Sequence, residues 1–400
     1  MSTPRDVLCK EIETRVENVR TLMEERGYDA LIVYGNNKVN GSLRYLTDYF
    51  PDRAGWTSLG PHKTYLFEGA VFLLSLHDEA TLLLDPGLMP GKEICVKNVS
   101  AGGFSIAEGV GLSGKNIAGL VNKAKSPRKI GIETYDRFPL PIYLELKESL
   151  TGTVFERSTI VEELRMVKSP LEIEIFKKAS AVGDLASQTV YDLLKDGVGR
   201  NELEIIRAAE NTMRMNDPMY EDSCTGSPSL ICSGTSIRGS MLHLPDPTKK
   251  IEKGDAIHWD IDLRYEGYPI DTSRTRVVGK ATDEQKHAYE VTLRMHEAVI
   301  KAAKPGTKAR DLVVLADKVA REGGFVLWDA FLGHGLGLDT HERPDLVVEE
   351  TKLAENMVLA IEPRVSLNNT YLFGIEDMVL VTKEGGVPLT KFPLTPLEIE

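Results

Sequence analysis

This chain of 400 residues contains few cysteines, and their spacing indicates neither a zinc-knuckle domain nor a small disulfide-bonded domain. The four cysteines are Cys9, Cys95, Cys224 and Cys232. No two of them form the C-x-x-C pair of a zinc knuckle or the close spacing of a disulfide framework. The interpretation is a protein with reduced thiols, as is usual in the cytoplasm.

The sequence also lacks the features by which nucleic acids and membranes are usually bound. It contains no block of lysine and arginine, and its net charge is −12, so we expect no nucleic-acid partner. The N-terminus has no apolar signal core, and no stretch reaches the roughly 18 apolar residues of a membrane-spanning helix. A cytoplasmic protein without membrane contact is expected.

What the chain does have is an ordinary globular composition, with 42% hydrophobic and 27% charged residues. Its length favours two domains. Short apolar runs alternate with helical patterns up to about residue 155, which is typical of an α/β domain. A connector follows, and Ser169 and Pro170 have the residue types that cap and begin a helix. The predicted domains are 1–160 and 161–400, the second with the mixed helices and strands of an α+β fold.

Three aspartates of the second domain lie in a predicted β-hairpin. Its strands are predicted over 256–263 and 268–278, with a turn at 265–267. We expect Asp260 and Asp271 to face each other across the pair, where like charges are destabilising. A divalent cation held between the two carboxylates would offset that repulsion.

Further metal-ligating residue types follow in three later blocks. His334 is flanked by glycines, Glu362 precedes a proline that cannot donate in a strand ladder, and Glu376 is predicted inside another strand. Any one of these residues alone would more often be a surface or capping group. Together, four carboxylates and one imidazole suit two ions such as Mn²⁺, Co²⁺ or Zn²⁺, which would activate a bridging water.

These blocks resemble the metal-binding motif of the pita-bread metallopeptidases, which include Xaa-Pro dipeptidase (prolidase), aminopeptidase P and creatinase. The resemblance rests on the interval between Asp260 and Asp271, on Gly333-His334-Gly335 and on His341-Glu342-x-Pro344. It implies a pita-bread catalytic domain behind a smaller creatinase-type α/β domain. It also implies an enzyme that hydrolyses a Xaa-Pro or similar amide bond.

The same resemblance implies a role for each candidate ligand. Asp260 would bind one metal ion, and Asp271 and Glu376 would bridge the two. His334 and Glu362 would bind the second ion. Glu362 would also relay a proton from the attacking water to the leaving amine.

Two further histidines match positions that contact the substrate in the family. His243 lies in a predicted strand over 240–244, where a satisfied core histidine is an equally good interpretation. His341 would stabilise the tetrahedral intermediate. His258, beside the first metal-binding aspartate, is interpreted as structural.

The chain departs from the peptidase pattern at three positions. Gly374 stands where an arginine is usual, Asp262 where a glycine is usual, and Arg364 where a small residue is common. Asp262 is either an additional ligand or a solvated charge at a strand edge. Arg364 is hypothesised to replace the missing cation of the pocket.

These departures keep other functions open. One is a pita-bread enzyme for a small non-peptide substrate, similar to ectoine hydrolase or dimethylsulfoniopropionate lyase. Another is a non-catalytic binding module, which is disfavoured because such modules typically lose their metal ligands. The resemblance also implies a homodimer, in which the aromatic stretch from Tyr45 to Trp56 closes over the partner's active site.

Overall fold

The computed structural model describes residues 4–36, 38–51, 69–84, 94–101, 112–121, 127–216, 229–237, 239–347 and 349–400. Cys224 and Trp56 lie outside these residues. The chain divides into two compact units, Met1–Arg165 and Met166–Glu400, near the boundary expected from the sequence. In the described part of the chain, no helix combines the length and the hydrophobicity needed to cross a bilayer.

The first unit is built around a mixed six-stranded sheet with strand order β4-β3-β2-β1-β5-β6. β1 pairs antiparallel with β2 and parallel with β5, as in the α/β arrangement that the sequence predicts. The strands are β1 Ala30–Gly35, β2 Ala70–Ser75, β3 Thr81–Leu84, β4 Asn98–Ala101, β5 Lys129–Glu133 and β6 Val154–Arg157. The helices are α1 Pro4–Arg26, α2 Gly41–Thr47, α3 Gly114–Val121, α4 Leu140–Ser149 and α5 Ile160–Arg165.

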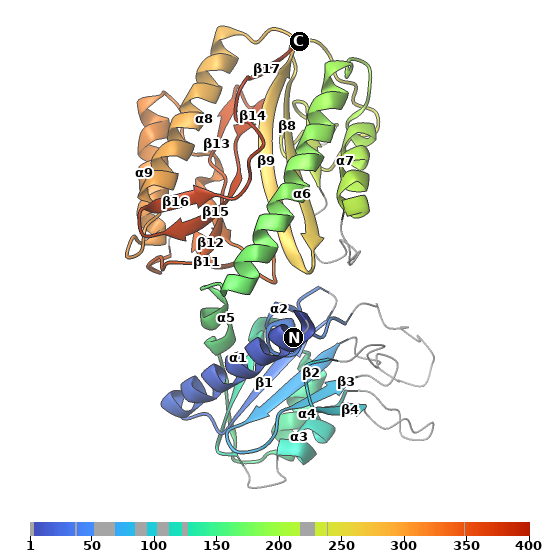
Figure 1. Ribbon diagram of the computed structural model, residues 1–400, viewed down its shortest axis with the longest axis vertical. Helices are drawn as coiled ribbons and strands as arrows, with labels where there is room; N and C mark the ends of the chain where they lie inside the picture. The colour runs from blue at the N-terminus through green and yellow to red at the C-terminus, as the bar shows by residue number, and fades with distance from the viewer. Residues whose placement is uncertain are drawn as a thin grey trace. The chain divides into compact units, whose positions relative to one another are not determined.

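Helices cover both faces of this sheet, which explains why β1 is apolar along its whole length (Figure 1). Ile32 shares a core with Ile117 of α3 and Ile142 of α4.

The expectation of reduced thiols is wrong in this unit, because Cys9 forms a disulfide with Cys95, 86 residues further along the chain. Sequence spacing does not reveal which distant cysteines a fold brings together.

Over its described residues, the second unit contains two pairs of α-helices and three sheets. Figure 1 shows the mixed helices and strands that are typical of an α+β pita-bread fold. The helices are α6 Pro170–Lys195, α7 Glu202–Asn216, α8 Asp283–Ala302 and α9 Ala309–Glu322. One sheet has the order β17-β9-β8-β7, with β7 Leu230–Cys232, β8 Ala256–Tyr265, β9 Tyr268–Val278 and β17 Glu398–Ile399. Another has the order β11-β10-β12-β15-β16, with β10 Gly333–Gly335, β11 Glu342–Leu346, β12 Val358–Ile361, β15 Asp377–Thr382 and β16 Gly385–Pro388. The hairpin of β13 Arg364–Leu367 and β14 Tyr371–Gly374 is the third sheet.

Each helix pair buries an apolar stripe against the strands. The stripe of α6 and α7 packs on β8 and β9, where Trp259 is fully buried. The stripe of α8 and α9 packs on the strands that follow it in sequence. Ser169 caps α6 through a reciprocal hydrogen-bond pair with Glu172, so the predicted helix start is confirmed. The inner faces of these sheets carry the polar residues described next.

Candidate metal centre

The pairing of the aspartates in the β8–β9 hairpin is shifted by two residues from the predicted one. Asp262, not Asp260, pairs directly with Asp271, and Asp260 pairs with Ser273. The two-residue turn at Glu266-Gly267 sets this register, which sequence alternation alone does not fix. Because side chains two residues apart share a face, all three carboxylates still lie on the same side of the hairpin.

Both glutamates of the candidate site lie where a strand ends. Glu362 follows β12 and precedes Pro363, as predicted, so its side chain stands at a break between β12 and β13. Glu376 was expected inside a strand, but it lies between β14 and β15. Its carbonyl accepts hydrogen bonds from Thr272 Oγ1 (2.9 Å) and from Arg274 (2.6 Å), which tie this break to β9.

His334 lies in β10 between two glycines that the close packing of the strand requires. A Cβ atom on Gly333 would lie 2.0 Å from the carbonyl oxygen of Ala360. The Nδ1 atom of His334 lies 3.1 Å from the carbonyl oxygen of Gly335. That contact favours the tautomer in which Nδ1 carries the proton and Nε2 keeps its lone pair for a ligand. Nε2 lies 3.4 Å from Asp271 Oδ2 and 3.5 Å from Glu362 Oε1.

The structure brings all five predicted ligands together in overlapping groups. In each group, one donor atom from every residue lies within 4.8 Å of the others. The groups are Asp260, Asp271 and Glu376; His334, Glu362 and Glu376; and Asp271, His334 and His341. One carboxylate oxygen each of Asp260, Asp271 and Glu376 is buried without a hydrogen-bond partner. Such atoms are costly to bury, so this donor set fits divalent cations.

Burial and mutual repulsion disfavour the charged form of these carboxylates. Burial, followed by the charge of Glu362, raises the pKa of Asp260 to about 7. Burial and the neighbouring carboxylates raise the pKa values of Asp271 and Glu376 well above their ordinary values. Burial also raises the pKa of Glu362, although Arg364 opposes the shift.

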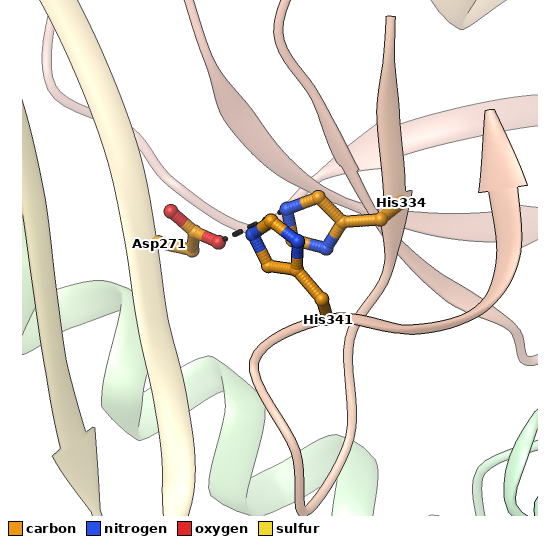
Figure 2. A group of neighbouring side chains, drawn as sticks. All are labelled: Asp271, His334 and His341. Atoms are coloured by element: carbon orange, nitrogen blue, oxygen red, sulfur yellow. Dashed lines mark ion pairs between the residues drawn. The ribbon is translucent and has the colours of Figure 1, made fainter. Parts of the chain in front are cut away.

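The two histidines are stacked face to face beside Asp271 (Figure 2). The ring centroids of His334 and His341 are 3.8 Å apart, and Phe331 lies against both rings. Burial lowers the pKa of each histidine to about 4, so both rings are neutral at physiological pH. Neutral imidazole is the form that ligates metal, and sequence reasoning did not place His341 within reach of a metal.

Two of the three positions that depart from the family pattern also lie at this site. A cavity of about 150 Å³ opens onto the cluster and is lined by Asp262 and Arg364, together with the candidate ligands Asp260, Asp271, His334 and Glu362. Asp262 is only 6% exposed and therefore is not a solvated strand-edge charge. Arg364 is buried, forms an ion pair with Glu362 and lies 5.5 Å from the ring centre of Trp328.

His243 does not line the cavity, although its neighbour Leu242 does. Residues 240–244 form bends, so the predicted strand is wrong here. Both ring nitrogens of His243 have partners, because Nε2 lies 2.9 Å from Glu202 Oε2 and Nδ1 lies 2.9 Å from the carbonyl oxygen of Ser240. Glu202 also accepts hydrogen bonds from Ser233 and Asp246, so it fixes the loop that carries His243.

One buried ion pair near the site was not found from the sequence. Lys168 Nζ lies 2.6 Å from Glu342 Oε1, and the two side chains are 1% and 9% exposed. Glu342 directly follows His341, and a Cβ atom on Gly337 would lie 2.0 Å from the same carboxylate oxygen. The pair therefore fills the turn that presents His341. This ion pair is recognised by the burial of both side chains, and no local sequence pattern shows that burial.

The two-domain architecture and the buried carboxylate–imidazole cluster define a metallohydrolase of the pita-bread class. The family model described as the creatinase/prolidase N-terminal domain matches residues 15–167. The model of metallopeptidase family M24 matches residues 174–383, more than half of the chain. The chain belongs to metallopeptidase family M24.

Individual relatives agree with this assignment. A Xaa-Pro dipeptidase of Pyrococcus horikoshii is 32% identical over 270 residues, which cover 66% of this chain and 73% of the relative. A putative dipeptidase of Bacillus subtilis is 28% identical over 392 residues, covering 95% of this chain and 98% of the relative. The crystal structure of the prolidase from Pyrococcus horikoshii superposes with a TM-score of 0.76 at 26% identity, covering 95% of this chain and 99% of that one.

Proposed function

We propose that this metallopeptidase hydrolyses Xaa-Pro or similar amide bonds at a dinuclear metal centre. The observation that carries the proposal is the buried cluster with three unpartnered carboxylate oxygens. The ligand groups overlap, because Asp271, His334 and Glu376 each belong to two of them. Of these three, only the carboxylates of Asp271 and Glu376 have two oxygens to offer to two ions. This sharing supports the assignment of both residues as bridging ligands between two ions.

The remaining ligands then divide between the two ions. Asp260 would complete one ion's ligands, and His334 and Glu362 would complete the other's. Two bound ions of the Mn²⁺, Co²⁺ or Zn²⁺ type would supply a water of lowered pKa and polarise the scissile carbonyl. Hard carboxylate oxygens with one imidazole suit these ions better than they suit soft metals.

The chain's own residues would carry the proton transfers. Glu362 is the proposed general base, because burial keeps the pKa of its carboxyl above the ordinary value and brings it nearer to neutral pH. It would take a proton from the attacking water and deliver it to the leaving amine. His341, held in place by stacking on His334, would donate a hydrogen bond to the developing oxyanion. A substrate contact by His243 and a homodimer both stay predictions.

A substrate panel tests the proposal. The full chain, supplied separately with Mn²⁺, Co²⁺ and Zn²⁺, is assayed on Xaa-Pro dipeptides, on longer Xaa-Pro peptides and on ectoine. Hydrolysis of a Xaa-Pro bond with at least one metal is the expected result. Turnover of ectoine alone would favour the non-peptide alternative, which the unusual Asp262 and Gly374 keep open. Metal binding without turnover of any substrate would favour a binding module.

A further inference from the structure

Arg274 is a buried cation on strand β9 that contacts the backbone of a candidate metal ligand. The residue is 1% exposed and pairs with Trp259 across the hairpin, so it stands on the face opposite to Asp271. Its guanidinium reaches past the edge of β9 to the break between β14 and β15, where Glu376 lies. A charge is costly to bury unless it is paired and hydrogen-bonded, so the partners of this arginine indicate its role.

Glu376 depends on β9 for the position of its backbone. Its N–H donates to the carbonyl oxygen of Ser273 at 3.0 Å, and its own carbonyl oxygen accepts from the Ser273 N–H at 3.4 Å. The same carbonyl oxygen also accepts from Thr272 Oγ1 at 2.9 Å and from Arg274 Nη1 at 2.6 Å. The guanidinium contact is the shortest of the three, and a hydrogen bond from a charged donor is stronger than one from a neutral donor. Arg274 is therefore the main anchor of this carbonyl group.

The same guanidinium joins Glu376 to two other parts of the catalytic unit. Its Nη2 atom donates to Asp377 Oδ1 at 2.7 Å and to the carbonyl oxygen of Phe392 at 2.8 Å. The N–H of Phe392 is held in turn by Asp184 of α6, at 2.8 Å from Oδ1. A planar fork of five N–H groups can fix three such acceptors at once, which the compact ammonium of a lysine cannot do.

We propose that Arg274 is a positioning residue for Glu376, and that the chain around Phe392 contributes to metal binding through it. Glu376 belongs to two of the ligand groups, so a shift of its backbone would weaken the binding of both ions. Residues that orient a ligand typically change metal affinity about 10- to 100-fold when they are replaced. The inference rests on the proposed metal centre and adds to it a residue that does not line the cavity.

Arg276 supplies a matched control on the same strand. It lies two residues from Arg274 on the same face of β9, is equally buried at 1% exposure, and donates to the carbonyl oxygen of Pro393. It also donates to the hydroxyl group of Tyr289. Within the described part of the chain, it makes no hydrogen bond to the break that carries Glu376. Both arginines therefore hold the end of the chain, but only Arg274 also holds the candidate ligand.

The test measures Mn²⁺ affinity of the full chain without substrate, from the electron paramagnetic resonance signal of free Mn²⁺. Arg274→Lys keeps the positive charge beside Asp377 but removes the fork, and it should weaken Mn²⁺ binding about 10- to 100-fold. Arg276→Lys should change this affinity by less than about threefold, because it does not touch the ligand. Both variants should lose stability to urea. Thr272→Val removes one neutral hydrogen bond to Glu376 and should weaken Mn²⁺ binding about 3- to 10-fold.

Activity gives a second measurement, because all five candidate ligands remain in Arg274→Lys. Saturating Mn²⁺ should restore most of its kcat, so that the defect is a higher Mn²⁺ requirement. Equal Mn²⁺ affinity in Arg274→Lys and Arg276→Lys would show a merely structural role and overturn the inference. If Arg274→Lys does not fold, the comparison of Thr272→Val with Arg276→Lys decides in the same way.

The affinity comparison also separates this inference from the proposed function. If the unaltered chain binds Mn²⁺ but hydrolyses no peptide, the peptidase activity is contradicted, while weaker Mn²⁺ binding by Arg274→Lys alone still supports the positioning role. If the unaltered chain binds no Mn²⁺, the metal centre and the inference are both overturned.

Discussion

Replacing Lys168 with methionine tests whether the buried ion pair holds the catalytic unit together. Lys168 Nζ and Glu342 Oε1 are 2.6 Å apart, and their side chains are 1% and 9% exposed. Methionine keeps much of the side-chain volume but leaves the Glu342 carboxylate buried without its cation. Breaking a buried pair in this way typically costs about 3–5 kcal/mol of unfolding free energy. In a unit of this size, that loss lowers Tm by roughly 6–20 °C.

The structure supplies a matched control at the same distance. Lys177 Nζ lies 2.6 Å from Glu174 Oε1, but these side chains are 52% and 62% exposed. Lys177→Met should therefore cost at most about 0.5 kcal/mol, because exposed pairs contribute little. The double variant Lys168→Met/Glu342→Gln should recover part of the loss, because it removes the uncompensated charge.

Tryptophan fluorescence during urea unfolding is a suitable assay. Trp259 and Trp328 both lie in the second unit, and Trp259 is fully buried. The kcat of Lys168→Met should also fall, because Glu342 packs inside the turn that carries His341. If Lys168→Met were as mild as Lys177→Met, the pair would contribute nothing through its burial and this reasoning would be refuted.

Three further predictions concern the candidate site. Glu376→Gln should lower metal affinity at least about 100-fold, since even residues that only orient a ligand typically contribute 10- to 100-fold. The same variant should stabilise the metal-free protein to urea, because burial, followed by repulsion from Asp271, disfavours the charged form of this carboxylate; a loss of stability would contradict the described cluster. Glu362→Gln should lower kcat about 10²- to 10⁴-fold without loss of fold, as removal of a general base does, and an unchanged kcat would exclude that role. Burial lowers the pKa of His243, but Cys232 and Glu202 raise this pKa by more, to about 10. Glu202→Gln should therefore lower the pH at which the NMR signals of the His243 ring titrate. Because the pKa of His243 is raised on folding, its pair with Glu202 stabilises the protein fully below about pH 6.5, and this contribution is lost as pH rises through about 10.

The sequence was most informative where local patterns set the structure. The hairpin of β8 and β9, the capped start of α6 and the strand end before Pro363 all follow from periodicity, capping residues and proline chemistry. The five candidate ligands share one cluster because carboxylates within apolar strands must be buried together or neutralised. These features were predictable without coordinates.

What the sequence could not show depends on register and on distant contacts. The pairing of Asp262 with Asp271 is fixed by a two-residue turn, and a shift of this kind changes which carboxylates meet. The partners of Lys168 and Cys9 lie 174 and 86 residues away. His243 was placed in a strand, but Glu202 holds it in a loop through contacts that no local pattern contains. Long-range packing decides each of these cases.

Counting bound metal against activity tests the central claim most directly. The full chain is freed of metal with a chelator and titrated with Mn²⁺, while Xaa-Pro dipeptide hydrolysis and bound ions per chain are measured together. The account predicts no hydrolysis without metal, full activity at two ions per chain, and loss of both ions in Asp271→Ala. Full activity with no divalent ion bound, or two ions still held by Asp271→Ala, would contradict it.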